Sequence, residues 1–135
     1  MLVRFWGTRG SLPAPASAET IRDKVVEALL AASGRRFADR SEAAAFADGL
    51  DFAVAGGYGG NTSCVELEGG DGSFIVCDMG SGLREFGLDA ARRVAAGHRK
   101  DYNFFMSHLH WDHIMGFPFF GVAFDPESTI RIHGG

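Results

Sequence analysis

The segment that decides the fold is a short apolar run followed at once by metal-binding side chains: Tyr102-Asn103-Phe104-Phe105-Met106, then Ser107-His108-Leu109-His110-Trp111-Asp112-His113. The apolar run is typical of a buried strand. A lone His is usually just a hydrogen-bonding residue, but here three His and one Asp fall within six positions. Burying so much polarity beside a strand without a partner would cost free energy. The segment therefore predicts a strand that delivers metal ligands to the edge of a sheet.

The spacing of these ligands suits two metal ions. Side chains at i and i+2 of an extended segment point to the same side, so His108 and His110 can converge on one ion while Leu109 points into the core. Asp112 and His113 follow after the chain turns, and they can hold a second ion. Imidazole and carboxylate ligands suit zinc, iron or manganese. Two such ions can share a bridging hydroxide that attacks an ester while both stabilise the developing charge.

Other polar residues are candidates for the same site. Asp112 could also orient the attacking water, because its carboxylate stays ionised beside a dication and is an acceptor rather than a general acid. Asp78 ends another apolar run, where it could orient the ligand histidines by hydrogen bonds or simply satisfy the amides of a turn. Asn61 and Thr62 follow two glycines and could bind a phosphate, although a plain turn also accounts for them.

Length and composition limit the remaining choices. With 135 residues, 46% of them hydrophobic, the chain has enough apolar material for the core of one domain. Its formal net charge of −4 gives no general reason to expect nucleic acid as a partner. Cys64 and Cys77 lie in apolar runs without C-x-x-C spacing, which predicts two buried, reduced thiols in a cytoplasmic protein rather than a disulfide. We expect no secretory leader and no membrane partner.

The pattern along the chain predicts a mixed fold, α/β in composition and α+β in arrangement. Strands are expected at residues 2–6, 62–67, 73–77, 102–106 and 129–133, with a helix at 83–96 capped by Ser81 and a short helix within 114–120. Thr20 and Asp23 predict the capping box of a helix that Gly34 ends, and a second helix is expected from Ser41 to Asp48. These two helices form an insertion at about residues 14–57. It could merely cover the sheet, or it could be a lid or substrate-selecting wall.

The segment from His108 to His113 resembles the metal motif of the metallo-β-lactamase superfamily. Further segments are similar to its phosphodiesterase branch, which includes ribonuclease Z and the cyclic-phosphate phosphodiesterases: Phe5-Trp6-Gly7-Thr8-Arg9-Gly10-Ser11-Leu12-Pro13, Gly59-Gly60-Asn61-Thr62-Ser63-Cys64 and Asp78-Met79-Gly80-Ser81-Gly82. The resemblance covers both ends of the chain but not the insertion. It implies an αββα sandwich of two similar halves, of which residues 1–135 would be the N-terminal half. It also supports the orienting role of Asp78.

The resemblance implies a metal-dependent hydrolase, with a small-molecule or nucleotide phosphodiester as its substrate and two divalent ions, zinc above manganese or iron, as its cofactors. In the superfamily the second half supplies a further His to the first ion, a bridging Asp, and a final His to the second ion. These ligands are missing here, so each ion would have two ligands from this chain, whereas a catalytic zinc normally has three from protein. The expected partner is therefore a C-terminal half or a second subunit, including another copy of the chain.

Two other functions remain open from the sequence. The first is a hydrolase of another ester class, such as a lactone or a thioester, because the metal motif does not fix the substrate. The second is a non-catalytic half-domain that binds metal or a partner.

Overall fold

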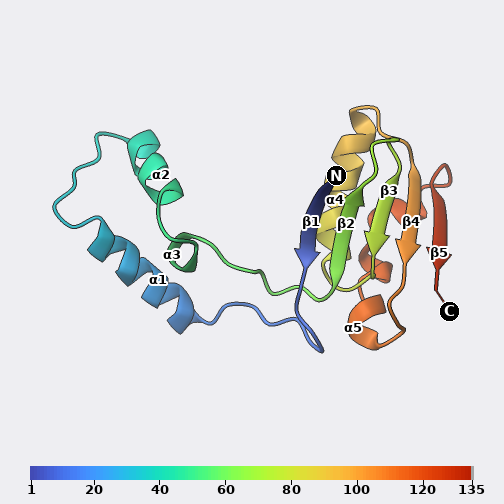
Figure 1. Ribbon diagram of the computed structural model, residues 1–135, viewed down its shortest axis with the longest axis horizontal. Helices are drawn as coiled ribbons and strands as arrows, with labels where there is room; N and C mark the ends of the chain where they lie inside the picture. Colours follow the sequence, from blue (N-terminus) through green and yellow to red (C-terminus); the bar gives the residue numbers. More distant parts are fainter. Residues whose placement is uncertain (135) are drawn as a thin grey trace. The chain divides into compact units, whose positions relative to one another are not determined.

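A computed structural model describes residues 1–134, which form two compact units (Figure 1). The first unit comprises Met1–Pro15 and the chain from Gly59 onward, and the second is Ala16–Tyr58. The first holds a five-stranded sheet, and the second is helical. The mixed α and β composition predicted from the sequence is confirmed. The helical unit nearly coincides with the segment predicted to be an insertion.

The sheet of the first unit is built from strands in their sequence order, so neighbours along the chain are also neighbours in space. The strands are β1 (Leu2–Gly7), β2 (Cys64–Glu68), β3 (Phe74–Cys77), β4 (Asp101–Phe105) and β5 (Thr129–His133). The first three pair antiparallel, whereas β3, β4 and β5 pair parallel. The five predicted strands are confirmed, with small shifts at their ends. Because β3 and β4 are parallel, their carboxyl ends meet at one edge.

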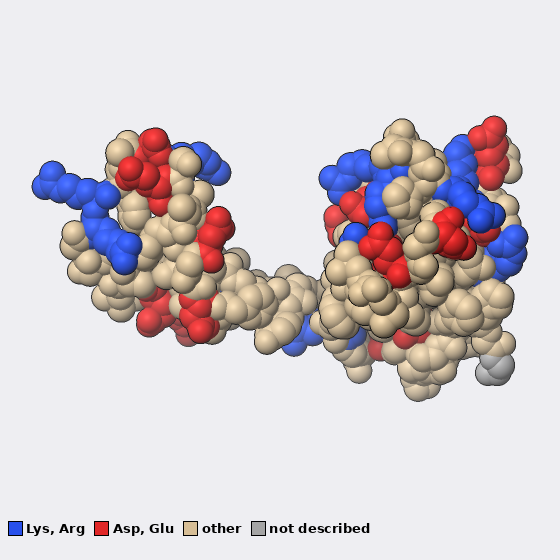
Figure 2. Space-filling model, turned by 45° about the horizontal axis from the view of Figure 1, so that its top comes forward, with Lys and Arg blue, Asp and Glu red and all other residues tan. Residues whose placement is uncertain are grey.

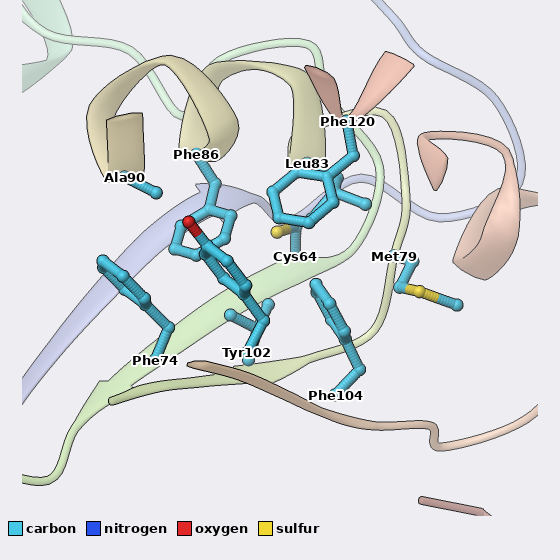
Figure 3. Close-up of a cluster of buried hydrophobic side chains, with 10 residues drawn as sticks. Cys64, Phe74, Met79, Leu83, Phe86, Ala90, Tyr102, Phe104 and Phe120 are labelled. Atoms are coloured by element: carbon cyan, nitrogen blue, oxygen red, sulfur yellow. The ribbon is translucent and has the colours of Figure 1, made fainter. Parts of the chain in front are cut away.

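The core of this unit lies between the sheet and helix α4 (Leu83–Ala95), which connects β3 to β4. Leu83, Phe86 and Ala90 recur at helical spacing and are buried. They point toward side chains of the strands, as Figure 3 shows for Phe74, Tyr102 and Phe104. Phe120 lies between the two 3-10 turns η1 (Phe117–Phe119) and η2 (Gly121–Phe124), and its ring stacks 5.8 Å from that of Phe86.

The opposite face of the sheet exposes apolar side chains. The strand register places Phe5 opposite Val65, Val65 opposite Cys77, and Cys77 opposite Phe105. Side chains alternate along a strand, so this row points away from the face on which the neighbouring residue Phe104 is buried. Phe5 is 69% exposed and Phe105 is 47% exposed. An exposed apolar sheet face is a surface on which another layer can pack.

The helical unit contains α1 (Ala18–Ala31), α2 (Arg40–Asp48) and the short α3 (Phe52–Ala55). The two predicted helices are present, and α2 lies within one residue of its predicted bounds, but the capping box predicted at the start of α1 is wrong. Ser17 caps α1 by accepting a hydrogen bond from the amide of Thr20, so Thr20 lies inside the helix and forms no capping box with Asp23. Asp39 caps α2 through two amides. Every residue of these helices is at least partly exposed.

The cap predicted for α4 is also wrong. Gly82 occupies its N-cap position, and the side chain of Ser81 points elsewhere. The Ser81 hydroxyl accepts a hydrogen bond from the amide of Thr62 and donates one to Oδ1 of Asn61. The residue therefore ties the turn after β3 to the segment before β2.

Gly116 marks a close approach between two turns of the first unit. Its amide donates to the carbonyl of Met79 at 2.9 Å, and a Cβ at position 116 would lie 1.9 Å from the carbonyl oxygen of Gly80. We expect Gly116→Ala to lower the free energy of unfolding by about 1–3 kcal/mol, because the backbone must move to make room. Denaturant unfolding measures this change. Gly121→Ala is the control, because a Cβ there meets nothing within 4 Å. Equal losses in both variants would contradict the close approach.

Candidate metal centre

The predicted ligands lie directly after β4, at the edge where the parallel strands end. The chain leaves the sheet at Met106 and turns into the short helix α5 (Trp111–Ile114), with His110 as its N-cap residue. The helix begins earlier than the sequence predicted, so Asp112 and His113 lie on a helical turn. The amide of His113 donates to the carbonyl of His110 at 2.9 Å, which folds the two pairs of ligands back toward each other.

The structure brings the four predicted ligands into one cluster. The ring centroid of His108 lies 4.5 Å from that of His110 and 4.0 Å from that of His113. Nε2 of His113 lies 3.4 Å from Oδ2 of Asp112. The cluster therefore combines imidazole nitrogen and carboxylate oxygen, which are the donor atoms that zinc, manganese and iron accept.

Leu109 does not point into the core, as the spacing predicted, but is 74% exposed. The prediction assumed that the chain stays extended through His110, whereas β4 ends at Phe105. Leu109 instead lines a small cavity of about 170 Å³ together with Met106, His108 and Ile132. Trp111 is exposed as well, so it is not a core aromatic residue of the described chain. The edge beside His108 thus carries an apolar surface.

Asp78 is the hub of a hydrogen-bond network beneath the histidines. It is 5% exposed and follows β3, as predicted. Its Oδ2 lies 2.8 Å from Nδ1 of His113 and accepts a hydrogen bond from the hydroxyl of Ser63. Its Oδ1 accepts from the amide and the hydroxyl of Ser107. The hydrogen bond that the sequence predicted between Asp78 and a ligand histidine is therefore present.

The network keeps Asp78 ionised. Burial raises the pKa of its carboxyl group, but the hydrogen bonds from Ser107, His113 and Ser63 outweigh this and lower the pKa below its usual range. The ionised carboxylate accepts a hydrogen bond from Nδ1–H of His113, which leaves Nε2 of that ring free to act as a ligand. Asp78 also has a φ of 63°, a left-handed conformation that Asp adopts more readily than most residues.

Asp112 is held from the other end of the chain. Its Oδ2 accepts a hydrogen bond of 2.8 Å from the amide of Ser11, which is 101 residues away. This hydrogen bond lowers the pKa of Asp112, although partial burial opposes it, and the nearby His113 and His108 lower it further. Ser11 itself has a φ of 64°. The contact with Ser11 could not be predicted from the sequence, because nothing in the local pattern links the two positions.

Asn61 and Thr62 lie against the turn after β3 and hold it in place. The hydroxyl of Thr62 accepts from the amide of Ser81, and the Thr62 side chain is fully buried. The carbonyl of Asn61 accepts from the amides of Thr8 and Arg9. These contacts account for the two residues as parts of a turn, which was one of their two predicted roles. Phosphate binding by them stays a prediction.

The four predicted ligands do not form a closed set within the described residues. Within residues 1–134 no group of three or more His, Cys, Asp or Glu side chains is arranged so that it could hold a metal ion. The sequence predicted two ligands from this chain for each ion, and that pairing stays a prediction. A catalytic zinc normally takes three ligands from protein, so the predicted two for each ion would need further donors.

Comparisons of the chain with protein-family models, with curated proteins and with solved structures found no match.

In the part of the chain that the structure describes, Cys64 and Cys77 are free thiols. None of the helices within residues 1–134 has the length and apolar character that crossing a membrane requires.

Proposed function

We propose that this chain is part of a metal-dependent hydrolase and that it contributes one half of a two-metal site. The observation that supports the proposal best is the cluster of predicted ligands at the carboxyl edge of parallel strands, namely His108, His110, Asp112 and His113. Asp78 is hydrogen-bonded to His113 beside this cluster. Polar residues that converge on such an edge are the usual location of chemistry in sheets of this kind. The resemblance to the metallo-β-lactamase superfamily supports the same reading.

The donor atoms of the cluster fit two divalent ions, with zinc as the first choice and manganese or iron as the others. His108 and His110 would hold one ion, and Asp112 and His113 the other. Nδ1 of His113 is engaged by Asp78, so Nε2 is the atom left to face a metal, and it lies on the side of Asp112. When bound, such ions lower the pKa of water and stabilise negative charge on the ester oxygens.

Asp112 would act on the attacking water as well as on a metal. Its carboxylate is held by the amide of Ser11 and stays ionised, so it can accept a hydrogen bond from water and orient it. An ionised carboxylate suits this role better than that of a general acid. The apolar cavity formed by Met106, Leu109 and Ile132 beside His108 would contact a non-polar part of the substrate.

The substrate class that we propose is a phosphodiester, either a small molecule or a nucleotide. The support comes from the segments 5–13 and 59–64, which resemble the phosphodiesterase branch. Figure 2 shows Lys and Arg interspersed with Asp and Glu on the drawn face of the sheet unit. Lys100, for example, lies 2.8 Å from Asp125 and 2.6 Å from Glu127. Such pairing favours a small phosphodiester over a long nucleic acid, which needs a basic surface.

We propose that further ligands come from a C-terminal half or a second subunit, which can be another copy of this chain. Two ligands for each ion fall short of the three that a catalytic zinc normally takes from protein. The exposed apolar row that includes Phe5 and Phe105 supports a second layer on the sheet, as in an αββα sandwich. The free thiols of Cys64 and Cys77 support a cytoplasmic location.

A second candidate function is a non-catalytic half-domain that binds metal or a partner. One observation favours it, namely that no three ligands within residues 1–134 are arranged to hold an ion. Such a half-domain would bind metal or a partner and would not turn over an ester.

Elemental analysis of the purified chain, taken together with its oligomeric state, tests the proposal. We expect the wild-type chain to bind zinc, and we expect His108→Ala with His110→Ala to remove about half of it, because one of two ligand pairs is lost. His133→Ala is the matched control, since that ring stacks on Phe105 and has no predicted ligand role. A chain that binds no zinc, or a control that loses as much as the double variant, would contradict the metal site.

Turnover separates the two candidate functions. The zinc-loaded chain is assayed with bis-para-nitrophenyl phosphate, a lactone and a thioester, as purified and in whichever assembly it forms. Faster turnover of the phosphodiester than of the other esters supports the proposed substrate class. Stoichiometric zinc without turnover of any ester supports the non-catalytic half-domain and contradicts the enzyme.

A further inference from the structure

The hydroxyl oxygen of Ser107 has polar neighbours on three residues but carries only one proton. This Oγ lies 2.9 Å from each carboxylate oxygen of Asp78 and 3.0 Å from Nδ1 of His108. A serine hydroxyl donates one hydrogen bond and accepts up to two. An ionised carboxylate only accepts. The proton of Ser107 must therefore point to Asp78, since two acceptors would otherwise face each other at hydrogen-bond distance.

This assignment leaves Ser107 with only lone pairs to offer to His108. A hydrogen bond at 3.0 Å between them then requires a proton on Nδ1 of His108. His113 follows the same rule without an intermediary, because its Nδ1 lies 2.8 Å from Asp78 but 3.3 Å from Ser107. When both rings are neutral, this arrangement places the proton of each on Nδ1 and the lone pair on Nε2.

We infer that Ser107 is a positioning residue that extends the influence of Asp78 to His108, so that one buried carboxylate sets the tautomer of two histidines. Asp78 fixes His113 directly and fixes His108 through the hydroxyl of Ser107. The relevance to metal binding rests on the proposed function, because an Nδ1–H ring presents Nε2 to an ion. The tautomers themselves are a property of the metal-free chain.

Long-range ¹⁵N–¹H correlation spectra of the metal-free full chain test the inference, recorded at an alkaline pH at which the spectra show both rings to be neutral. We expect both rings of the wild type to carry the proton on Nδ1. In Ser107→Ala, His108 should move toward the Nε2–H form that a free imidazole prefers, while His113 should stay unchanged. Ser107→Thr retains the hydroxyl and should retain the wild-type tautomers.

Ser63→Ala is the matched control, because Ser63 also donates its hydroxyl proton to Asp78 at 2.9 Å. Its loss removes one hydrogen bond from the carboxylate and leaves the Ser107 contact in place, so neither histidine should change tautomer. If Ser107→Ala and Ser63→Ala shift His108 equally, the effect is general loosening, and the inference fails. It also fails if His108 carries its proton on Nε2 in the wild type, or if Ser107→Ala leaves it on Nδ1.

Zinc affinity gives a second measurement that separates the inference from the proposed function. Loss of an outer hydrogen-bond partner typically weakens metal binding 10–100-fold, and we expect about 10-fold for Ser107→Ala, with Ser107→Thr close to the wild type. If the tautomers behave as expected but the wild type binds no zinc, the inference stands and the proposed function fails. If zinc binds and Ser107→Ala changes neither tautomer nor affinity, the inference fails alone.

Discussion

Asp78→Ala is expected to lower the free energy of unfolding of the sheet unit by about 3 kcal/mol or more. The carboxylate accepts hydrogen bonds from Ser63, Ser107 and His113, and its loss leaves donors in a largely buried place without a partner. Each buried group left unsatisfied costs about 1–3 kcal/mol. Alanine is also strained at a φ of 63°, which adds about 1 kcal/mol. Denaturant unfolding of the metal-free chain measures the total.

Asp78→Asn is the matched variant for this prediction. Asparagine tolerates the left-handed conformation and keeps one acceptor oxygen, so it should lose clearly less stability than alanine. Asp71→Ala is the exposed control. Asp71 lies in a surface turn, where its carboxylate accepts hydrogen bonds from the amide and the hydroxyl of Ser73. If the Asp78 and Asp71 variants unfold at the same denaturant concentration, the network at Asp78 does not stabilise the fold.

The loss of stability caused by Asp78→Ala should also depend on pH. The folded-state pKa of Asp78 lies below the unfolded value of about 3.9, so its contribution is fully present above pH 3.9 and is lost as the pH falls through the folded pKa. Asp78→Ala lacks this contribution at every pH. The difference in stability between the wild type and the alanine variant should therefore shrink below about pH 4.

The strands and the ligand cluster could be predicted because their signals are local. Tyr102 to Met106 is largely apolar and is followed at once by the ligand segment, and strand β4 ends at Phe105, just before that segment. The alternation rule failed at Leu109 because it holds only in extended backbone, and the chain had already left the sheet. The cap of α1 was predicted wrongly for a related reason. Ser17 and Thr20 are both residue types that cap helices, and only the backbone conformation decides which of them is the N-cap.

The contacts that complete the site could not be predicted, because they join distant parts of the chain. Asp112 meets the amide of Ser11 across 101 positions, and Ser107 meets Asp78 across 29. A backbone amide carries no signal in the sequence, and a serine beside a histidine is a common pair. These contacts depend on the parallel pairing of β3 with β4 and on the turn after β1, and both of these are tertiary features.

The second large effect is expected at Glu66, in the middle of strand β2. Its side chain is 2% exposed and lies 2.6 Å from Nη2 of Arg93, which is itself only 16% exposed. The indole N–H of Trp6 donates a hydrogen bond of 3.1 Å to the same carboxylate. Removing one partner of a buried ion pair leaves an uncompensated charge, which typically costs about 3–5 kcal/mol. We expect Glu66→Ala to fall near the lower end of this range, because Arg93 keeps a second partner in Asp89 at 2.9 Å.

The variant Glu66→Gln tests whether charge or hydrogen bonding stabilises the contact between Glu66 and Arg93. Within the described residues, Nε and Nη2 of Arg93 make no hydrogen bond of good geometry despite their short distances to carboxylates, so the attraction is mainly ionic. Glutamine keeps the shape and an acceptor for Trp6 but loses the charge, and it should therefore recover only a small part of the loss. Glu68→Ala is the exposed control, since that side chain is 40% exposed and pairs with Arg4 at 3.2 Å. It should lose less than about 1 kcal/mol. Full recovery with glutamine would show that directed hydrogen bonds, rather than the buried charge, tie helix α4 to strand β2.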